Sequence, residues 1–259
     1  MKISIVTAYY NRKQLFYQTL KSIVKSKFSD FELIVVDDGS SLEHRLEEYL
    51  DEFSFLRLIR LEPENKWYAN PCIPFNIGIR AAQGEIIVLQ NPECLHVHDV
   101  LTYLSENVND TNYISVSTYA LNEEITNKLP NLISENNFID YFGLLPQQAT
   151  GGSPTLGWYN HSRFRPEHLH FCSALTRKNI EELGGFDERY AYGISYDDNE
   201  FIERIRRKGL KMIIADNVSV IHQWHVNVLY KHLKFQDLHN KNRNLYYYVT
   251  MKENMIKAN

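Results

Sequence analysis

The sequence contains little cysteine, glycine or proline. Its 259 residues include 3 Cys, 11 Gly and 8 Pro. Cys72, Cys94 and Cys172 lie far apart and form no Cys-x-x-Cys pair, which argues against a disulfide scaffold or a cysteine zinc site. We expect three reduced and mostly buried thiols. The low glycine and proline content argues against a low-complexity or disordered chain.

Long apolar runs and an excess of basic charge are absent as well. No apolar segment approaches the length of about 20 residues that spans a bilayer, and the start MKISIVTAYYNRK lacks the apolar core of a secretion signal. The net charge of -4 and the pI near 6.2 do not suit a nucleic-acid partner. With 44% hydrophobic and 23% charged residues, the composition is typical of a globular domain. We therefore expect a cytoplasmic protein.

Predicted strands and helices alternate in the first half of the chain. The strands are ISIVTAY, FELIVVDDGS, LRLIRL and EIIVLQ, and the helices cover about 12–25, 42–52 and PFNIGIRAAQG. This alternation predicts right-handed βαβ units around a mostly parallel sheet. Ligands of such sheets bind beyond the carboxyl ends of the strands. Polar clusters at 7–11, 37–40 and 90–93 should therefore meet at one edge.

The second half is less regular. Residues from about 119 to 166 include the segment QQATGGSPTLGWYNHSRFRPEH, which has the length and composition of a functional lid or a disordered stretch. LHFCSALT predicts a strand, RKNIEELGGF and SYDDNEFIERIRRKG predict helices, and LKMIIADNVSVIHQWH predicts one or two short strands. An amphipathic helix should cover about 226–251. Core packing, a homodimer contact and peripheral membrane contact are all compatible with such a helix.

Two acidic pairs are candidates for chemistry. Asp37 and Asp38 precede Gly39, which is compatible both with a turn and with a nucleotide pocket. Asp197 and Asp198 precede the apolar positions of a helix, so either acid could cap that helix or act as a general base. A helix N-terminus lowers a carboxylate pKa, whereas burial by neighbouring aromatic rings would raise it.

Histidines supply a further candidate site. His222 and His225 are three residues apart after a predicted strand, a spacing that allows metal ligation but also arises by chance. His168 and His170 flank another predicted strand in the same way.

Taken in order, these blocks resemble the GT-A glycosyltransferases of the large inverting family 2 and their relatives that transfer galactose or N-acetylgalactosamine. The resemblance is carried by SIVTAYYNR, ELIVVDDGS, FNIGIRAAQGEIIVLQNPE, ALTRKNIEELGGFDE and YDDNEFIERIRRKG, over about residues 2–225. It implies a Rossmann-like GT-A domain at 1–225, with a nucleotide-sugar half at about 1–118 and an acceptor half at about 119–225. Residues 226–259 would form a C-terminal helical extension.

The resemblance also implies roles for individual residues. Asp198 would be the catalytic base and Asp197 its partner. The donor, a UDP-sugar, would contact residues at four places in the chain, namely Thr7, Ala8, Tyr9, Arg12, Asp38, Gly39, Asn76, Arg80, Gln90 and Asn91. A loop carrying Trp158 would close over the donor and meet the acceptor, together with His170. The acceptor hydroxyl would belong to a glycan, a glycolipid or a protein.

The chain departs from this family at the end of the fourth predicted strand. Relatives carry an Asp-x-Asp type motif there, whose carboxylate binds a divalent cation on the donor diphosphate. Here the residues are Gln90, Asn91 and Pro92, followed by Glu93. Three possibilities follow: Glu93 and His222 hold Mn²⁺ or Mg²⁺, Gln90 and Asn91 replace the metal, or the protein binds a nucleotide-sugar without transferring it.

Overall fold

The computed structural model describes residues 1–134, 138–148, 156–226 and 233–259. The strands are β1 (Ile3–Tyr9), β2 (Phe31–Asp37), β3 (Leu56–Arg60), β4 (Ile86–Gln90), β5 (Cys94–His96), β6 (Asn112–Ala120), β7 (Gly157–Asn160), β8 (Cys172–Thr176) and β9 (Lys211–His222). The helices are α1 (Lys13–Ile23), α2 (Cys72–Ala81), α3 (Val100–Asn107), α4 (Glu123–Ser134), α5 (Phe138–Leu144), α6 (Arg177–Leu183), α7 (Asp197–Arg207) and α8 (Phe235–Tyr248). Short 3-10 helices cover Leu42–His44, Glu47–Tyr49, Pro63–Asn65 and Glu188–Tyr192, and a π-helical turn covers Val249–Glu253.

All the strands named above belong to one sheet in the order β3-β2-β1-β4-β8-β6-β9-β5, with β7 paired to β6. Strands β3, β2, β1 and β4 are parallel, as predicted from the alternation of strands and helices. Beyond β4 the sheet becomes mixed, because β8 runs antiparallel to both β4 and β6. The parallel half places the carboxyl ends of β1, β2 and β4 at one edge.

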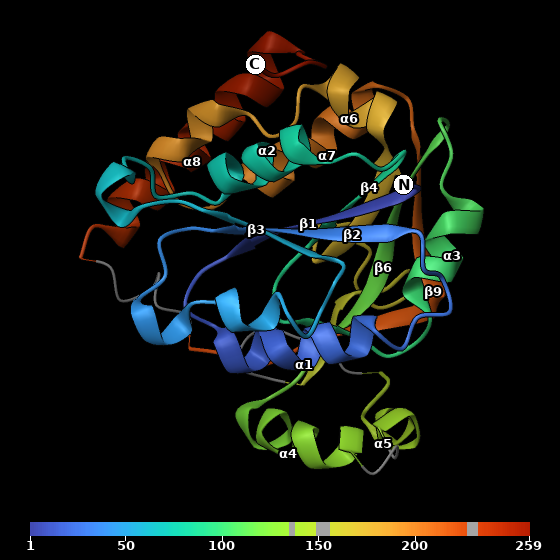
Figure 1. The fold of residues 1–259 in the computed structure, drawn as a ribbon. Helices are drawn as coiled ribbons and strands as arrows, with labels where there is room; N and C mark the ends of the chain where they lie inside the picture. The colour runs from blue at the N-terminus through green and yellow to red at the C-terminus, as the bar shows by residue number, and fades with distance from the viewer. Residues whose placement is uncertain (135–137, 149–155, 227–232) are drawn as a thin grey trace.

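Apolar side chains on the two faces of this sheet build two cores. In β2, Leu33 and Val35 belong to one core, while Ile34 and Val36 belong to the other, as the two-residue period of a strand requires. Helices α1 and α3 contribute to the first core, and α2, α6 and α7 to the second. Figure 1 shows α1 on one side of the sheet and α2, α6, α7 and α8 on the other.

The stretch predicted to be irregular contains regular structure. Helix α4 presents Ile125, Leu129 and Ile133 at a spacing of four residues to a third core, which also includes Trp158 of β7. Pro130 lies inside α4. Residues 149–155 of the predicted lid lie outside the described residues. The helices α4 and α5 lie below α1 in Figure 1.

Three boundaries differ from the predictions. The helix expected over 42–52 is two short 3-10 turns, Leu42–His44 and Glu47–Tyr49. Of the one or two short strands predicted over 210–225 there is one, β9; it is longer than expected, at 12 residues, and its pairing with β6 shifts between Val116 and Ser117. The C-terminal helix begins at Phe235, and residues 227–232 of the predicted helix lie outside the described part of the chain.

Helix α8 packs on the domain. Asn242 is fully buried, whereas Tyr247 and Tyr248 near the end of the helix are about half exposed. Among the described residues, no helix combines the length and the apolar character needed to cross a bilayer.

Candidate functional site

A cleft opens at the carboxyl ends of β1 and β4, where the sequence predicted a site. Its volume is about 460 Å³. It is lined by Ala8, Arg12, Pro71, Phe75, Asn91, Pro92, Glu93, Leu169, His170, Phe171, Ser195, Asp197, Asp198, His222 and His225. The cleft therefore brings together eight predicted site residues from both halves of the chain: Ala8, Arg12, Asn91, Glu93, His170, Asp197, Asp198 and His222.

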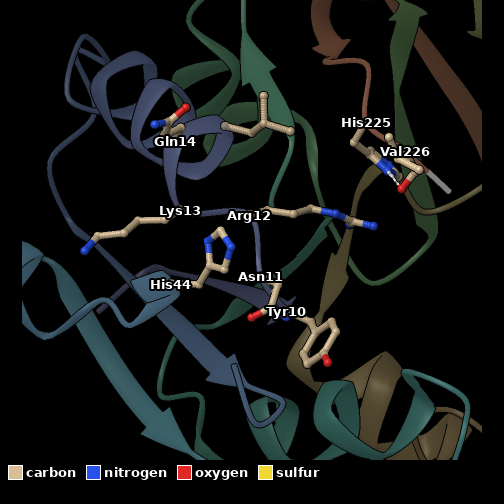
Figure 2. Close-up of a pocket in the computed structure, with 9 residues that line it drawn as sticks. Tyr10, Asn11, Arg12, Lys13, Gln14, His44, His225 and Val226 are labelled. Carbon is tan, nitrogen blue, oxygen red and sulfur yellow. Dashed lines mark hydrogen bonds between the residues drawn. The ribbon is translucent and has the colours of Figure 1, made fainter. Parts of the chain in front are cut away.

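A second cavity of about 350 Å³ adjoins the cleft on the α1 side. Arg12 and His225 line both spaces. In Figure 2 the side chain of Arg12 extends toward His225, whereas Lys13 points the opposite way. Tyr10, Asn11 and the other residues of this cavity come mainly from the turn after β1 and the start of α1.

Glu93 lies at the centre of a carboxylate–imidazole cluster. Its Oε2 accepts a hydrogen bond from Arg12 Nη1 at 2.8 Å. Its Oε1 lies 3.0 Å from His222 Nε2 and 3.4 Å from His225 Nε2. Burial alone would raise the pKa of Glu93, but the Arg12 charge and the bonds from both histidines hold it well below its usual range. Glu93 is therefore a carboxylate at neutral pH.

Strand pairing explains why these distant residues meet. Strand β5 begins directly after Glu93 and pairs antiparallel with β9, so that Cys94 faces His222. The Gln223 backbone N–H also donates to the Glu93 carbonyl at 3.1 Å. His225 then follows three residues after His222. The spacing of the two histidines marked His225 as a candidate ligand, but nothing in the sequence marked it as a partner of Glu93.

The sequence allows Gln90 and Asn91 as amide side chains that could replace a metal, but this interpretation is wrong for the first of them. Gln90 is fully buried, and its side chain bonds Cys94 O at 2.9 Å and His96 Nε2 at 2.9 Å. Gln90 is the last residue of β4 and lies on the same face as Ile86 and Val88, which belong to the core beneath α1. Its side chain thus points into the core rather than into the cleft. Asn91, the next residue, does line the cleft.

The acidic pair begins α7 at the opposite wall of the cleft. Asp197 is 5% exposed and accepts a hydrogen bond from Asn70 Nδ2 at 2.8 Å. Burial and the neighbouring Asp198 charge raise the pKa of Asp197 to about 6, against the lowering effects of His170 and Asn70. Asp198 is half-buried, and burial raises its pKa too, although its Oδ1 accepts from the Asn199 N–H at 2.8 Å. Burial thus outweighs the helix N-terminus at both acids.

The turn that delivers these acids is strained. Ser195 and Tyr196 immediately precede Asp197 and have φ values of 64° and 67°, in the left-handed region that non-glycine residues rarely adopt. Each such residue costs about 1–3 kcal/mol and persists only where the surrounding structure holds it. Strained residues of this kind gather at functional sites.

Asp38 lies beyond the end of β2 on the face that carries α2. Its carboxylate accepts hydrogen bonds from the Tyr68 hydroxyl and, at 2.6 Å, from Lys66 Nζ. Lys66 Nζ also lies 4.9 Å from the centroid of the Tyr10 ring, which is 45% exposed. Gly39 follows with φ of 80°, and a Cβ there would lie 3.2 Å from Pro63. Tyr10, Asp38 and Lys66 thus form a polar, aromatic corner.

Two of the predicted donor contacts in β1 face the core. Tyr9 is fully buried against Phe16, and its hydroxyl donates to His44 O at 2.7 Å. Thr7 is 1% exposed and donates to Gln90 O at 3.0 Å. Because Thr7 and Tyr9 share the strand face of Ile3 and Ile5, they point away from the cleft. Tyr10, which follows the strand directly, is exposed enough to meet a ligand. It lies within the predicted cluster at 7–11 but was not among the individually predicted donor contacts.

Asn76 and Arg80 also take other positions than predicted. Asn76 is buried and bonds both the N–H and the carbonyl of Phe186 at 2.8 Å. Arg80 pairs with Glu188 at 3.3 Å, with its side chain 62% exposed. Helix α2 runs back along the sheet from its start at Cys72, so Arg80 lies roughly 12 Å along the helix from the cleft end. Neither side chain lines the cleft.

Trp158 is placed differently as well. It is 4% exposed, packs against Tyr119 and Phe142, and donates from Nε1 to Gln147 O at 2.8 Å. It therefore belongs to the third core and offers no face to an acceptor. His170, by contrast, lines the cleft next to Asp197, and its Nδ1 has no hydrogen-bond partner among the described residues.

This mixed sheet, with flanking helices and a cleft at the carboxyl ends of β1 and β4, has the GT-A architecture. Residues 4–166, more than half of the 259, match the family described as Glycosyl transferase family 2. The chain therefore belongs to glycosyl transferase family 2. The "Chondroitin synthase" of Escherichia coli is 25% identical over 85% of this chain and 34% of its own length. The uncharacterized glycosyltransferase YfnE of Bacillus subtilis (strain 168) is 23% identical over 87% of this chain and 65% of its own length. This chain thus spans about a third of the chondroitin synthase.

Solved structures share the fold at low identity. A mannosyltransferase from Pyrobaculum calidifontis, in complex with GDP-Man and Mn²⁺, matches with a TM-score of 0.57 and 17% identity, covering 87% of this chain and 58% of its own. GalNAc-T7 with UDP, GalNAc and Mn²⁺ matches with a TM-score of 0.58 and 17% identity, covering 87% and 44%. TarS 1-349 of S. aureus in complex with UDP-GlcNAc matches with a TM-score of 0.57 and 14% identity, covering 92% and 64%.

Proposed function

We propose that this chain is an inverting glycosyltransferase that moves a hexosyl or N-acetylhexosaminyl group from a UDP-sugar to an acceptor hydroxyl. The observation that carries the proposal is that one cleft holds the Glu93 cluster and the acids at the start of α7. The UDP and UDP-GlcNAc bound to structural neighbours support the donor class. The name of the Escherichia coli chondroitin synthase supports a glycan acceptor.

The donor-side residues suit a divalent cation. Glu93, His222 and His225 each offer one ligand atom, and these atoms lie within 4.8 Å of one another. A carboxylate with two imidazoles is a ligand set that Mn²⁺ and related cations accept. These three residues would hold the cation that the family resemblance implies. When bound, such a cation offsets the negative charge of the diphosphate leaving group.

The protein side chains carry the rest of the proposed reaction. The acceptor oxygen forms a bond to the anomeric carbon on the face opposite the diphosphate, and the bond from that carbon to the phosphate oxygen breaks with its electron pair leaving on the diphosphate. The acceptor proton passes to Asp198, whose raised pKa makes it a better base than an ordinary aspartate. Arg12 lines both cavities, and we assign to its guanidinium the donation of hydrogen bonds to the diphosphate.

At the nucleotide end, Tyr10 offers a partly exposed ring and Asp38 a carboxylate. We assign base stacking to Tyr10 and hydrogen bonding to a base N–H to Asp38, which requires Lys66 or Tyr68 to yield its present bond to that carboxylate. Asn91 lines the cleft that also holds the acids, and it is assigned to the donor sugar or phosphate.

Turnover of UDP-sugars with added Mn²⁺, and then with EDTA, tests the proposal. We expect EDTA-sensitive release of UDP in the wild-type protein. Asp198→Asn should keep UDP-sugar binding while transfer falls by about 10²-fold or more, the size expected for loss of a general base. Asp237→Asn is the matched control, because Asp237 also occupies the first turn of a helix but lies on the exposed side of α8.

Other outcomes would change the assignment. Wild-type turnover in Asp198→Asn would remove Asp198 as the base. EDTA-resistant turnover would favour Asn91 and Arg12 acting without a metal. If no UDP- or GDP-sugar is turned over although donors bind, the protein is a nucleotide-sugar-binding member of the family without transfer activity.

A further inference from the structure

Helix α8 contacts the turn that carries the acids. Both the helix and the turn lie beyond the family match at residues 4–166. The Ile194 N–H donates to Leu238 O at 3.2 Å. The Tyr196 ring packs against His239 and Tyr246, with centroids 5.2 and 5.5 Å away. The strained turn before Asp197 is therefore braced by a helix that begins only at Phe235.

The central contact is made by Asn242. Its side chain is fully buried, and Nδ2 donates to Ser195 O at 2.8 Å and to Tyr190 O at 3.0 Å. Both amide hydrogens are thus used on the backbone at the two ends of one short segment, 190–195. Ser195 is also a wall residue of the cleft.

The fit between α8 and this segment requires a glycine. A Cβ on Gly193 would lie 2.1 Å from Asn242 Oδ1 and 2.7 Å from Leu238 O. The backbone at Gly193 therefore approaches the helix too closely for any residue with a Cβ to fit without movement. On the other side of the turn, Asn70 Nδ2 holds Asp197 at 2.8 Å. Asn70, before α2, thus holds Asp197 directly, and Asn242, on α8, holds the backbone of the turn that precedes it.

We propose that Asn242 is a positioning residue for the transfer reaction, acting through the Ser195–Tyr196 turn on Asp197 and Asp198. This inference rests on the proposed function. The two left-handed residues need an external restraint, and the Asn242 amide provides it on the carbonyl of the first of them. Without the amide, the turn relaxes, and the acids lose their alignment with the acceptor hydroxyl while the donor side of the cleft is unchanged.

Asn242→Leu tests the proposal, because leucine has the same branching and the same number of side-chain heavy atoms but cannot donate to either carbonyl. We expect kcat to fall at least tenfold while KM for the UDP-sugar stays within about threefold. Amide hydrogen exchange should become faster in a peptide covering residues 193–199. Asn242→Ala also removes both donors to the Tyr190 and Ser195 carbonyls and serves as a second variant should Asn242→Leu fail to fold.

Asn179→Leu is the matched control. Asn179 is 2% exposed, and its Nδ2 donates to Asp110 O at 3.0 Å, next to the end of β8 that pairs with the start of β4. Its loss should lower the melting temperature without lowering kcat or speeding exchange in residues 193–199. A general loss of stability would affect both variants alike.

Unchanged kcat in a folded Asn242 variant would overturn the proposal, as would unchanged exchange over 193–199. An equal fall of kcat in Asn179→Leu would also overturn it. A failure of the proposed function can be told apart from a failure of this inference, because it would appear in the wild-type protein as donor binding without transfer. In that case the exchange measurement still decides whether Asn242 restrains the acid-bearing turn.

Discussion

Replacing Asp197 by asparagine should stabilise the protein above pH 6. The native pKa of Asp197 is raised from 3.8 to about 6, mainly by burial and then by the charge of Asp198. Between these two values the native state holds a proton that the unfolded chain has released, so wild-type stability falls as the pH rises through that window. The shift corresponds to about 3 kcal/mol. The amide introduced by Asp197→Asn would carry no charge, and its oxygen could still accept the bond from Asn70.

Urea unfolding of both proteins at a series of pH values between about 3.5 and 8 measures this difference. The free energies of unfolding should nearly coincide at the acid end, diverge from about pH 4 to pH 6, and stay about 3 kcal/mol apart at higher pH. Asp37→Asn is the control of opposite sign, because Asp37 is fully buried but paired with Arg60 at 2.7 Å, so its replacement should destabilise. A difference between Asp197→Asn and wild type that does not change with pH would refute the reasoning.

Two further predictions concern the donor side of the cleft. Glu93→Gln should raise the Kd for Mn²⁺ by about 100-fold. At a Mn²⁺ concentration about 100 times the wild-type Kd, the wild-type protein should gain about 2.7 kcal/mol, which is a rise in Tm of roughly 5–10 °C. The variant should gain only about 1 °C at the same concentration. Differential scanning fluorimetry checks this against Glu32→Gln, a buried carboxylate bonded to Ser4 and Gln83 at the other end of the sheet. An equal Mn²⁺ shift in Glu93→Gln would exclude Glu93 as a ligand. Tyr10→Ala should weaken UDP binding by about 1–3 kcal/mol, as measured by calorimetry. Tyr247, on α8, is about as exposed as Tyr10, and Tyr247→Ala should leave UDP binding unchanged. If Tyr10→Ala binds UDP as tightly as the wild type, the base does not stack on Tyr10.

The predicted parallel half of the sheet is confirmed. It could be predicted because each of its strands is a short apolar run followed by a polar turn. The errors within that half concern which way side chains point. Gln90, Thr7 and Tyr9 stand in or directly at the end of their strands and face the α1 side, which a strict two-residue period would have shown. The same period correctly turns Asp38 toward Tyr68 and α2.

The irregular middle escapes prediction for a different reason. Ile125, Leu129 and Ile133 do recur at helical spacing, but the polar residues and Pro130 between them, and the glycine-rich stretch that follows, dominate the composition. Trp158 looks like an exposed recognition residue in that context. Its burial depends on α5 folding back beneath β6 and β7, a contact that local sequence does not reveal.

The residues that complete the site depend on contacts between segments far apart in the chain. Glu93 could be proposed as a ligand because it follows a strand end, but its association with both histidines depends on the register in which Cys94 faces His222. Likewise the acids could be placed at a helix start, but the restraint on their turn comes from Asn242. Strand ends and helix starts are local properties, and the pattern of apolar residues specifies them. Pairing register and helix docking are set by the packing of the whole domain. Residues that carry the chemistry can therefore be predicted from local sequence patterns, whereas the residues that hold them in place cannot.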